Sequence, residues 1–186
     1  MNSFRLRANQ VLGEIAETFE RLNPEEIEGV TAVLAEATRV FIIGVGREGL
    51  VAKAFAMRLM HAGLEVHWAW DDTTPNMNAG DVMVMVNGSG AIGHLDYVFG
   101  QVKSTGATTI VVTGVPDADT PLAADFVLHV PATVFHGHGE LVPSVQPMGS
   151  LFEQACLIAY DLMVVDIALR RSSDPEAMAA RHRNFE

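Results

Sequence analysis

The spacing of hydrophobic residues changes near residue 39. Before it, apolar residues recur every three or four positions from Val11 to Leu22. Asn23-Pro24 then supplies an N-cap residue and a proline for a first helical position, and two glutamates follow. After residue 39 the apolar residues form short, largely β-branched runs, several of them closed by glycine. The pattern predicts two N-terminal helices followed by strands that alternate with helices.

Five short apolar runs are the predicted strands. Helical spacing between them is clearest at 50–62 and 95–105. Strands that are apolar on both faces are typical of a parallel sheet covered by helices on both sides. The sequence therefore predicts a three-layer α/β/α domain with a five-stranded parallel sheet. The runs are RVFIIG (39–44), LEVHWAW (64–70), DVMVMV (81–86, followed by the turn NGSG), ATTIVVTG (107–114) and DFVLHVP (125–131).

The last third of the chain combines an irregular segment with a long apolar helix. Residues 131–147 contain three prolines and two histidines without periodicity, so we predict a functional loop or a lid. A helix of about six turns is predicted after Gly149, and it is apolar on nearly every side. Because such a helix must be buried, we expect another subunit to cover it. The expected assembly is a homo-oligomer, either a dimer or a tetramer.

The whole chain fits one domain. Its 186 residues, 49% of them apolar, suffice for one core without disulfides. The only cysteine, Cys156, lies in an apolar stretch, which suits a core residue in a reducing compartment. The parts of the single domain 1–186 are 1–37 (N-terminal helices), 38–131 (core strands and helices), 132–148 (loop or lid) and 149–186 (C-terminal helices).

Net charge and hydropathy indicate which classes of binding partner are excluded. A net charge of −11 opposes binding to nucleic acids and anionic membranes. A small anion can still bind through local N–H groups, because charges beyond a Debye length of ~8 Å are largely screened. The N-terminus lacks a signal-peptide pattern, and no run approaches the about 18 apolar residues that span a bilayer. We expect a cytoplasmic protein without nucleic-acid or membrane partners.

Two glycine-rich turns follow predicted strands. The turn 44–49 has the spacing of a dinucleotide-binding turn, and 87–90 closes the third strand in the same way. Glycine lets backbone N–H groups approach an anion at a helix N-terminus. Because the chain has no room for a separate catalytic domain, the pair of turns predicts a small polyhydroxylated, anionic ligand. Either turn alone is also compatible with binding nothing.

Longer motifs extend around these turns and toward the C-terminus. They are GVGREGLVAKAFAMRLMHAG (44–63), DDTTP (71–75), NGSG (87–90), QPMGSLFEQ (146–154) and ARHRNFE (180–186). In this order they resemble the SIS (sugar isomerase) domain family, and within it the 6-phospho-3-hexuloisomerases, over nearly the whole chain. The resemblance implies a flavodoxin-like strand order, a multimer with sites at subunit interfaces, and metal-free aldose–ketose or ketose–ketose isomerisation through an enediol.

Such chemistry needs a base and a donor to the sugar oxygens. Glu153 is the candidate base, because it begins the predicted last helix among apolar neighbours that would raise its pKa. From the residues alone, a glutamate that only complements the helix dipole fits equally well, and the resemblance favours catalysis. His61 and His182 are the candidate proton shuttles. We expect neither a cofactor nor a metal.

The candidate binding residues surround the glycine turns and the start of the last helix. Arg47 lies inside the first turn and is placed to face the ligand. Thr74 follows the second strand, where its hydroxyl suits a sugar oxygen, although a plain turn fits equally well. The full set is Gly46, Arg47, Glu48, Thr74, Asn87, Gly88, Ser89, Gly90, Gly149 and Ser150.

Four positions depart from the family, which usually has serine at 48 and 87 and hydroxyl or acidic residues at 91 and 92. A carboxylate ~4 Å from a phosphate costs about 4 kcal/mol per pair of unit charges at an effective dielectric of 20. Either Glu48 points away from a phosphate, or it binds the hydroxyls of a sulfonated or uncharged sugar. The substitutions favour the second alternative. The four residues are Glu48, Asn87, Ala91 and Ile92.

Two other interpretations stay open. His136, His138 and Glu140 alternate with glycine and can present three metal ligands, but the order is not a recognised zinc pattern, so we expect a lid that contacts the substrate. The chain can also be a sugar- or sugar-phosphate-binding regulatory module that kept the fold and lost the chemistry. Retention of Glu153, His61 and His182 favours an enzyme.

Overall fold

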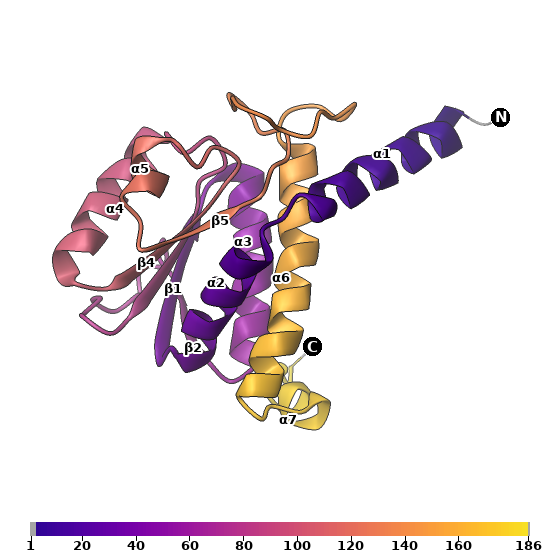
Figure 1. The fold of residues 1–186 in the computed structure, drawn as a ribbon. Helices are drawn as coiled ribbons and strands as arrows, with labels where there is room; N and C mark the ends of the chain where they lie inside the picture. Colours follow the sequence, from indigo (N-terminus) through magenta and orange to yellow (C-terminus); the bar gives the residue numbers. More distant parts are fainter. Residues whose placement is uncertain (1–2, 186) are drawn as a thin grey trace.

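A five-stranded parallel sheet between two layers of helices forms the centre of the chain, as predicted (Figure 1). The computed structural model describes residues 3–185. The strand order is β2-β1-β3-β4-β5, which is the flavodoxin-like order. The elements are α1 (Ser3–Glu20), α2 (Pro24–Glu36), β1 (Arg39–Gly44), α3 (Gly46–His61), β2 (Glu65–Trp68), β3 (Val82–Val86), α4 (Gly93–Thr105), β4 (Thr108–Thr113), α5 (Asp119–Leu122), β5 (Phe126–His129), α6 (Ser150–Arg170) and α7 (Pro175–Ala180).

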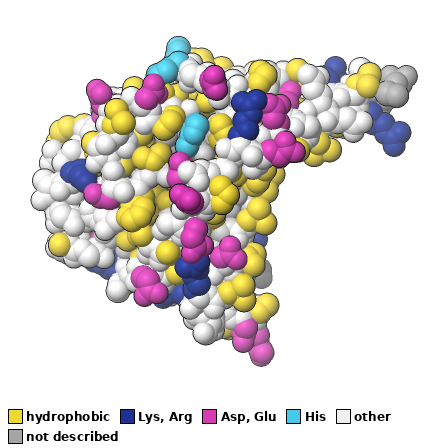
Figure 2. Space-filling model, in the orientation of Figure 1, with side chains coloured by type: hydrophobic (Ala, Val, Ile, Leu, Met, Phe, Trp, Pro, Cys, Tyr) yellow, Lys and Arg dark blue, Asp and Glu magenta, His cyan; other side chains and the backbone are white. Residues whose placement is uncertain are grey.

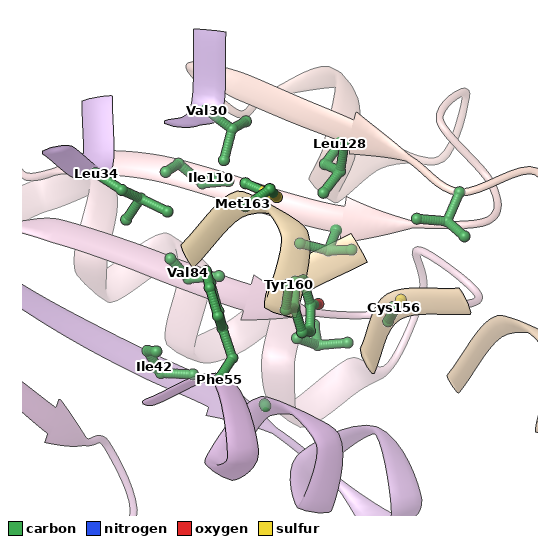
Figure 3. Packing of buried hydrophobic residues seen from close by; sticks show 14 of the residues in the cluster. Val30, Leu34, Ile42, Phe55, Val84, Ile110, Leu128, Cys156, Tyr160 and Met163 are labelled. Atoms are coloured by element: carbon green, nitrogen blue, oxygen red, sulfur yellow. The ribbon is translucent and has the colours of Figure 1, made fainter. Parts of the chain in front are cut away.

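Side chains of the inner strand β1 point alternately to the two helix layers. Ile42 faces the layer formed by α2, α3 and α6, whereas Phe41 faces α4. Both side chains are buried, which explains why the strand shows no alternation of polar and apolar residues. In the first layer, Phe55 of α3 stacks on Tyr160 of α6 with ring centroids 4.3 Å apart (Figure 3).

The strand order brings both glycine turns to one edge of the sheet. β1 lies between β2 and β3, and all three strands run parallel. The chain leaves β1 in one direction and β3 in the other, so their carboxyl ends form a topological switch point, where α/β proteins bind ligands. Helix α3 begins at Gly46 directly after β1, and the turn 87–90 follows β3.

The N-terminal helices have the predicted start at Asn23. Its side chain accepts a hydrogen bond from the Glu25 N–H at 2.9 Å and caps α2. The C-terminal part of helix α1 packs against α6, and the N-terminal part of α1 projects from the rest of the molecule (Figure 1). The Glu14 carboxylate of α1 accepts hydrogen bonds from Ser144 Oγ at 2.7 Å and from the Val145 N–H at 3.0 Å. Helix α1 therefore anchors the segment that precedes α6.

Helix α6 has one covered face and one exposed apolar face. The chain itself buries the inner face against α2 and α3. Figure 2 shows hydrophobic side chains at the surface along α6, below the projecting α1. An oligomer that covers this outer face stays a prediction. The exposed side chains recur at helical spacing and are Ile158, Leu162, Val165 and Leu169, between 39% and 73% exposed.

Among residues 3–185, no helix is both long enough and apolar enough to cross a lipid bilayer.

Candidate functional site

A cavity of about 590 Å³ opens at the switch point of the sheet. Five segments surround it: the start of α3, the turn after β3, the loop after β4, the loop that precedes α6, and the first turn of α6. It lies where the strand order predicts a ligand. Its lining residues are Val45, Gly46, Arg47, Glu48, Ser89, Ala91, Ile92, Ala118, Phe135, His136, His138 and Glu153.

The first glycine turn packs α3 tightly onto β1. A Cβ atom at Gly49 would lie 2.8 Å from the Gly44 carbonyl oxygen, which is closer than a side chain allows. Gly46 has a φ angle of 55°, in the left-handed region that favours glycine. This turn sets the first turn of α3 at the rim of the cavity, so that Arg47 and Glu48 line it.

Glu48 points into the second glycine turn. Its Oε2 accepts a hydrogen bond from the Gly88 N–H at 3.0 Å. A Cβ atom at Gly88 would overlap Oε1 of Glu48, so a larger residue at position 88 would displace this carboxylate. Burial raises the pKa of Glu48 to about 7; the Gly88 N–H opposes this rise and the charge of Glu153 adds to it. Of the two orientations considered from the sequence, the structure has the one that faces the site.

Glu153 lies in the first turn of α6 and is 8% exposed. Arg47 Nε lies 2.9 Å from Glu153 Oε2, and Arg47 Nη1 donates to Ser150 Oγ at 3.1 Å. The ion pair is close but poorly aligned, because within residues 3–185 this buried Oε2 accepts no hydrogen bond. Burial raises the pKa of Glu153, and the charge of Arg47 opposes the rise without cancelling it. The cavity thus contains a carboxylate with hydrogen-bonding capacity to spare.

The segment 131–147 is closed on itself and tied to α6. Within it, the Thr133 hydroxyl and N–H both donate to the Val142 carbonyl, at 2.7 and 3.1 Å. Near its end, the Gln146 side chain exchanges two hydrogen bonds of 2.9 and 2.8 Å with Gln154 of α6. Three of its residues line the cavity, and its opening as a lid stays a prediction.

The tip of this segment contributes aromatic side chains to the cavity. The rings of Phe135 and His136 lie 3.9 Å apart between centroids, and His136 has a φ angle of 59°. His138 Nε2 lies 3.2 Å from Oδ1 of Asp117, which belongs to the loop after β4. The tip is therefore tied to the neighbouring loop.

Most of the predicted site residues gather around this cavity. The Gly88 N–H and the Ser150 hydroxyl border it through their hydrogen bonds to Glu48 and Arg47. Gly149 precedes α6 beside Glu153. The predicted residues that line the cavity directly are Gly46, Arg47, Glu48, Ser89 and Glu153.

Six predicted binding residues are not part of the cavity lining; besides Gly88, Gly149 and Ser150 at its border, these are Asn87, Thr74 and Gly90. Asn87 is fully buried, and its Nδ2 donates to Asp96 Oδ1 at 3.4 Å. The Thr74 hydroxyl donates to the Trp68 carbonyl at 2.7 Å, which is the role of a turn residue. Gly90 supplies a φ angle of 71° in the turn after β3. Each side chain or backbone shapes a loop, so ligand contact by these residues stays a prediction.

His61 and His182 lie at the opposite end of α3. Gly46 begins this helix and His61 ends it, a separation of about 22 Å at 1.5 Å per residue. The two imidazoles stack with ring centroids 5.3 Å apart, and Arg181 Nη1 donates to the His61 carbonyl at 3.0 Å. One chain does not bring these histidines to Glu153, because the rigid length of α3 separates them. A shared site requires another subunit.

Phe135 and Ala118 line the cavity and were not predicted from the sequence. Ala118 follows β4, and loops at the carboxyl ends of parallel strands meet at the switch point, so this rule would have found it. Phe135 lies in a segment without periodicity, and only its packing beside His136 places it at the site.

The histidine-glycine loop does not form a metal centre in the structure. Among residues 3–185, no three His, Cys, Asp or Glu side chains gather where they could hold a metal ion. His136, His138 and Glu140 therefore do not converge.

Comparison with known proteins identifies a family to which this chain is similar. A profile of the SIS domain family matches residues 33–158. A 3-hexulose-6-phosphate isomerase from Bacillus subtilis (strain 168) is 30% identical over 95% of this chain and 96% of its own, and one from Mycobacterium gastri is 35% identical over 95% and 88%. A hypothetical protein from Methanococcus jannaschii has a TM-score of 0.80 at 26% identity over 100% of both chains; its structure infers a molecular function of 3-hexulose-6-phosphate isomerase.

Proposed function

The chain belongs to the SIS domain family, and on that basis we propose that it is an isomerase of open-chain sugars that works through an enediol, with Glu153 as the base. The observation that carries the proposal is the placement of Glu153. It combines a buried carboxylate, a raised pKa and a spare oxygen at the cavity of the switch point. The names of the relatives support the reaction class.

The chemistry moves one proton between adjacent carbons. The ionised carboxylate of Glu153 takes the proton from the carbon next to the carbonyl, and the C–H electron pair becomes the double bond of the enediol while the carbonyl oxygen gains a proton. Return of the proton to the other carbon, with loss of a proton from the other hydroxyl, completes the isomerisation. The Arg47 guanidinium has five N–H donors, and those not directed at Glu153 and Ser150 suit the sugar oxygens.

The proposed reaction needs no metal. The Glu153 carboxylate supplies the base, and the N–H donors around it polarise the carbonyl group of the sugar. Treatment with a chelator is expected to leave turnover unchanged. A loss of turnover that added divalent metal restores would contradict this part of the proposal.

The active form in this proposal is a homo-oligomer. The exposed apolar stripe on α6 is the face that a second subunit would cover. Such an assembly also offers the route by which His61 and His182 of one subunit reach the cavity of another, where they would shuttle protons between the sugar oxygens.

The end of the substrate remote from the reacting carbons then lies near the turn after β3. In the relatives' names that end carries a 6-phosphate. Glu48 at this turn favours a sulfonated or uncharged sugar instead. It also favours the second candidate function, a regulatory module that binds a sugar without converting it.

The test is proton exchange followed by NMR in heavy water. The intact protein is incubated separately with fructose 6-phosphate, its 6-sulfonated analogue and free fructose. Deuterium is expected next to the carbonyl of at least one sugar, and E153Q is expected to slow the exchange by about 10²- to 10⁴-fold because the base is lost. E25Q, which changes an exposed glutamate in the first turn of α2, is the matched control. Binding without exchange of any sugar would support the regulatory module and overturn the isomerase.

A further inference from the structure

The Gly88 N–H is the donor that a glycine turn after a strand normally offers to an anionic ligand. Here the chain's own carboxylate occupies it, since Glu48 Oε2 accepts this hydrogen bond at 3.0 Å. The fit depends on both partners. A Cβ atom at Gly88 would overlap Glu48 Oε1 and lie 3.2 Å from Cε1 of Phe152. Glycine at 88 and glutamate at 48 therefore form one cradle.

The carboxylate belongs to the first turn of α3, where the helix dipole favours negative charge. It also keeps capacity for a ligand. A carboxylate accepts about four hydrogen bonds through its two oxygens, and the Gly88 N–H uses one of them. Glu48 lines the cavity, so further donors can reach it only from that side.

The charged groups around the cavity disfavour an anion at this position. Arg47 of α3 is the arginine that lines the cavity. Its guanidinium is directed at Glu153 and Ser150 of α6. Glu48 and Glu153 are both carboxylates, and the loop residue His138 faces the carboxylate of Asp117. A phosphate beside Glu48 would meet two acidic side chains, and the arginine that lines the cavity is already paired with one of them, Glu153.

The remaining wall of the turn offers no compensation. Ala91 and Ile92 line the cavity with apolar side chains, and Asn87 is turned inward to Asp96. Ser89 is the one hydroxyl side chain of the turn 87–92 that lines the cavity. Burial is the main reason for the raised pKa of Glu48, and the charge of Glu153 adds to it.

We propose that Glu48 is a specificity-determining residue, which selects a sugar whose end remote from the reacting carbons is an uncharged hydroxyl rather than a phosphate. A hydroxyl donates to the free lone pairs of Glu48, and such a charge-assisted hydrogen bond is strong. A phosphate would instead have to displace Glu48 from Gly88. This inference rests on the proposed function for the identity of the ligand as an open-chain sugar.

The test uses ligands that cannot react, so that it does not depend on turnover. Binding of D-glucitol and of D-glucitol 6-phosphate to the full-length protein is measured by isothermal titration calorimetry. The wild type is expected to bind glucitol at least about tenfold more tightly than its phosphate ester. E48S, which replaces the carboxylate by a small hydroxyl and frees the Gly88 N–H, is expected to reverse the preference.

Two more variants keep the result interpretable. E48Q retains the shape of Glu48 without its charge, so it should lose most of the discrimination against phosphate even if E48S folds poorly. E176Q, on the exposed helix α7, is the control and should bind like the wild type. Tighter binding of the phosphate ester by the wild type, an unchanged preference in E48S and E48Q, or no binding of either polyol would each overturn the inference.

Turnover is then measured separately with free fructose and fructose 6-phosphate. The expected binding pattern without proton exchange would overturn the isomerase and leave the role of Glu48 intact. Exchange that is faster with fructose 6-phosphate than with free fructose in the wild type, by kcat/KM, would overturn the role of Glu48 and leave the isomerase intact.

Discussion

The two ends of helix α3 differ in what they can do within one chain. Its N-terminal end lies at the switch point, where Arg47 and Glu48 share a cavity with Glu153. At its C-terminal end, the His61 ring stacks on His182, and Arg181 donates a hydrogen bond to the His61 carbonyl. Both ends belong to a motif that resembles one family; the N-terminal end was predicted to bind the substrate and His61 at the C-terminal end to take part in catalysis.

The comparison shows that one motif can serve two separate surfaces. A helix of sixteen residues is rigid and cannot fold its two ends onto one ligand. The carboxylate end forms a cavity from elements of its own chain. The C-terminal end, with His61, can contribute to such a site only in an assembly. There, the C-terminal end of α3 in one subunit must face the N-terminal end of α3 in another.

The largest effect is expected from breaking the assembly. The double variant L162E/V165E introduces two charges into the exposed apolar stripe of α6, and a buried, unpaired charge is costly at an interface. Light scattering coupled to size exclusion should show the variant as a monomer and the wild type as an oligomer. If both ends of α3 are needed, proton exchange should fall about 100-fold or more, as for loss of a catalytic group.

Q101E, on the exposed face of α4, adds a charge elsewhere and should preserve both assembly and exchange. A wild type that is monomeric and active would contradict the requirement for two subunits.

A smaller, positive effect is expected from mixing two inactive variants. E153Q lacks the base and H182N lacks the histidine, and each should be inactive alone. If a site takes Glu153 from one subunit and His182 from another, random assembly of a 1:1 mixture should restore about a quarter of the sites. Proton exchange by the mixture, after joint unfolding and refolding, measures this recovery.

H94N, which alters an exposed histidine at the start of α4, is the control for the effect of losing an imidazole. Full activity of H182N alone would remove His182 from the chemistry. Two inactive variants that gain nothing on mixing would contradict a site shared between subunits.

The smallest effect is expected in how the free energy of unfolding depends on pH through Glu48. The pKa of Glu48 is about 7 in the folded chain, above its ordinary value of 4.5. The folded state therefore binds the proton more tightly, and the stability from this group is complete below about pH 4.5 and lost as the pH rises through 7. Relative to E48Q, the wild type should lose roughly 1–3 kcal/mol of unfolding free energy between pH 4.5 and 7.5.

Urea unfolding of both proteins at equal protomer concentration measures this difference, because assembly adds to apparent stability. Glu153 of α6 also acts on Glu48, so the E153Q background should show a smaller loss than the native background. Identical pH profiles for the wild type and E48Q would contradict the raised pKa.

Much of the fold was predictable because its signals are local. The strand RVFIIG and the N-cap at Asn23 follow from residues that neighbour each other in sequence, and the structure confirms both. The edges of the cavity followed from a general rule, since glycine turns after parallel strands meet at the switch point. Phe135 had no comparable signal, because the segment around it has no periodicity and is held by bonds within itself and to α6.

The sequence by itself determined the parallel sheet, the two glycine turns and the apolar long helix, because periodicity, β-branching and glycine act within a few residues. Only the tertiary structure decided that Glu48 faces Gly88 rather than solvent, that Arg47 pairs with Glu153, and that His61 lies a helix length away from both carboxylates. The Glu48 hydrogen bond joins residues 40 apart and the Arg47 bond to Ser150 joins residues 103 apart. Side-chain directions set by packing between distant elements have no local signature in the chain.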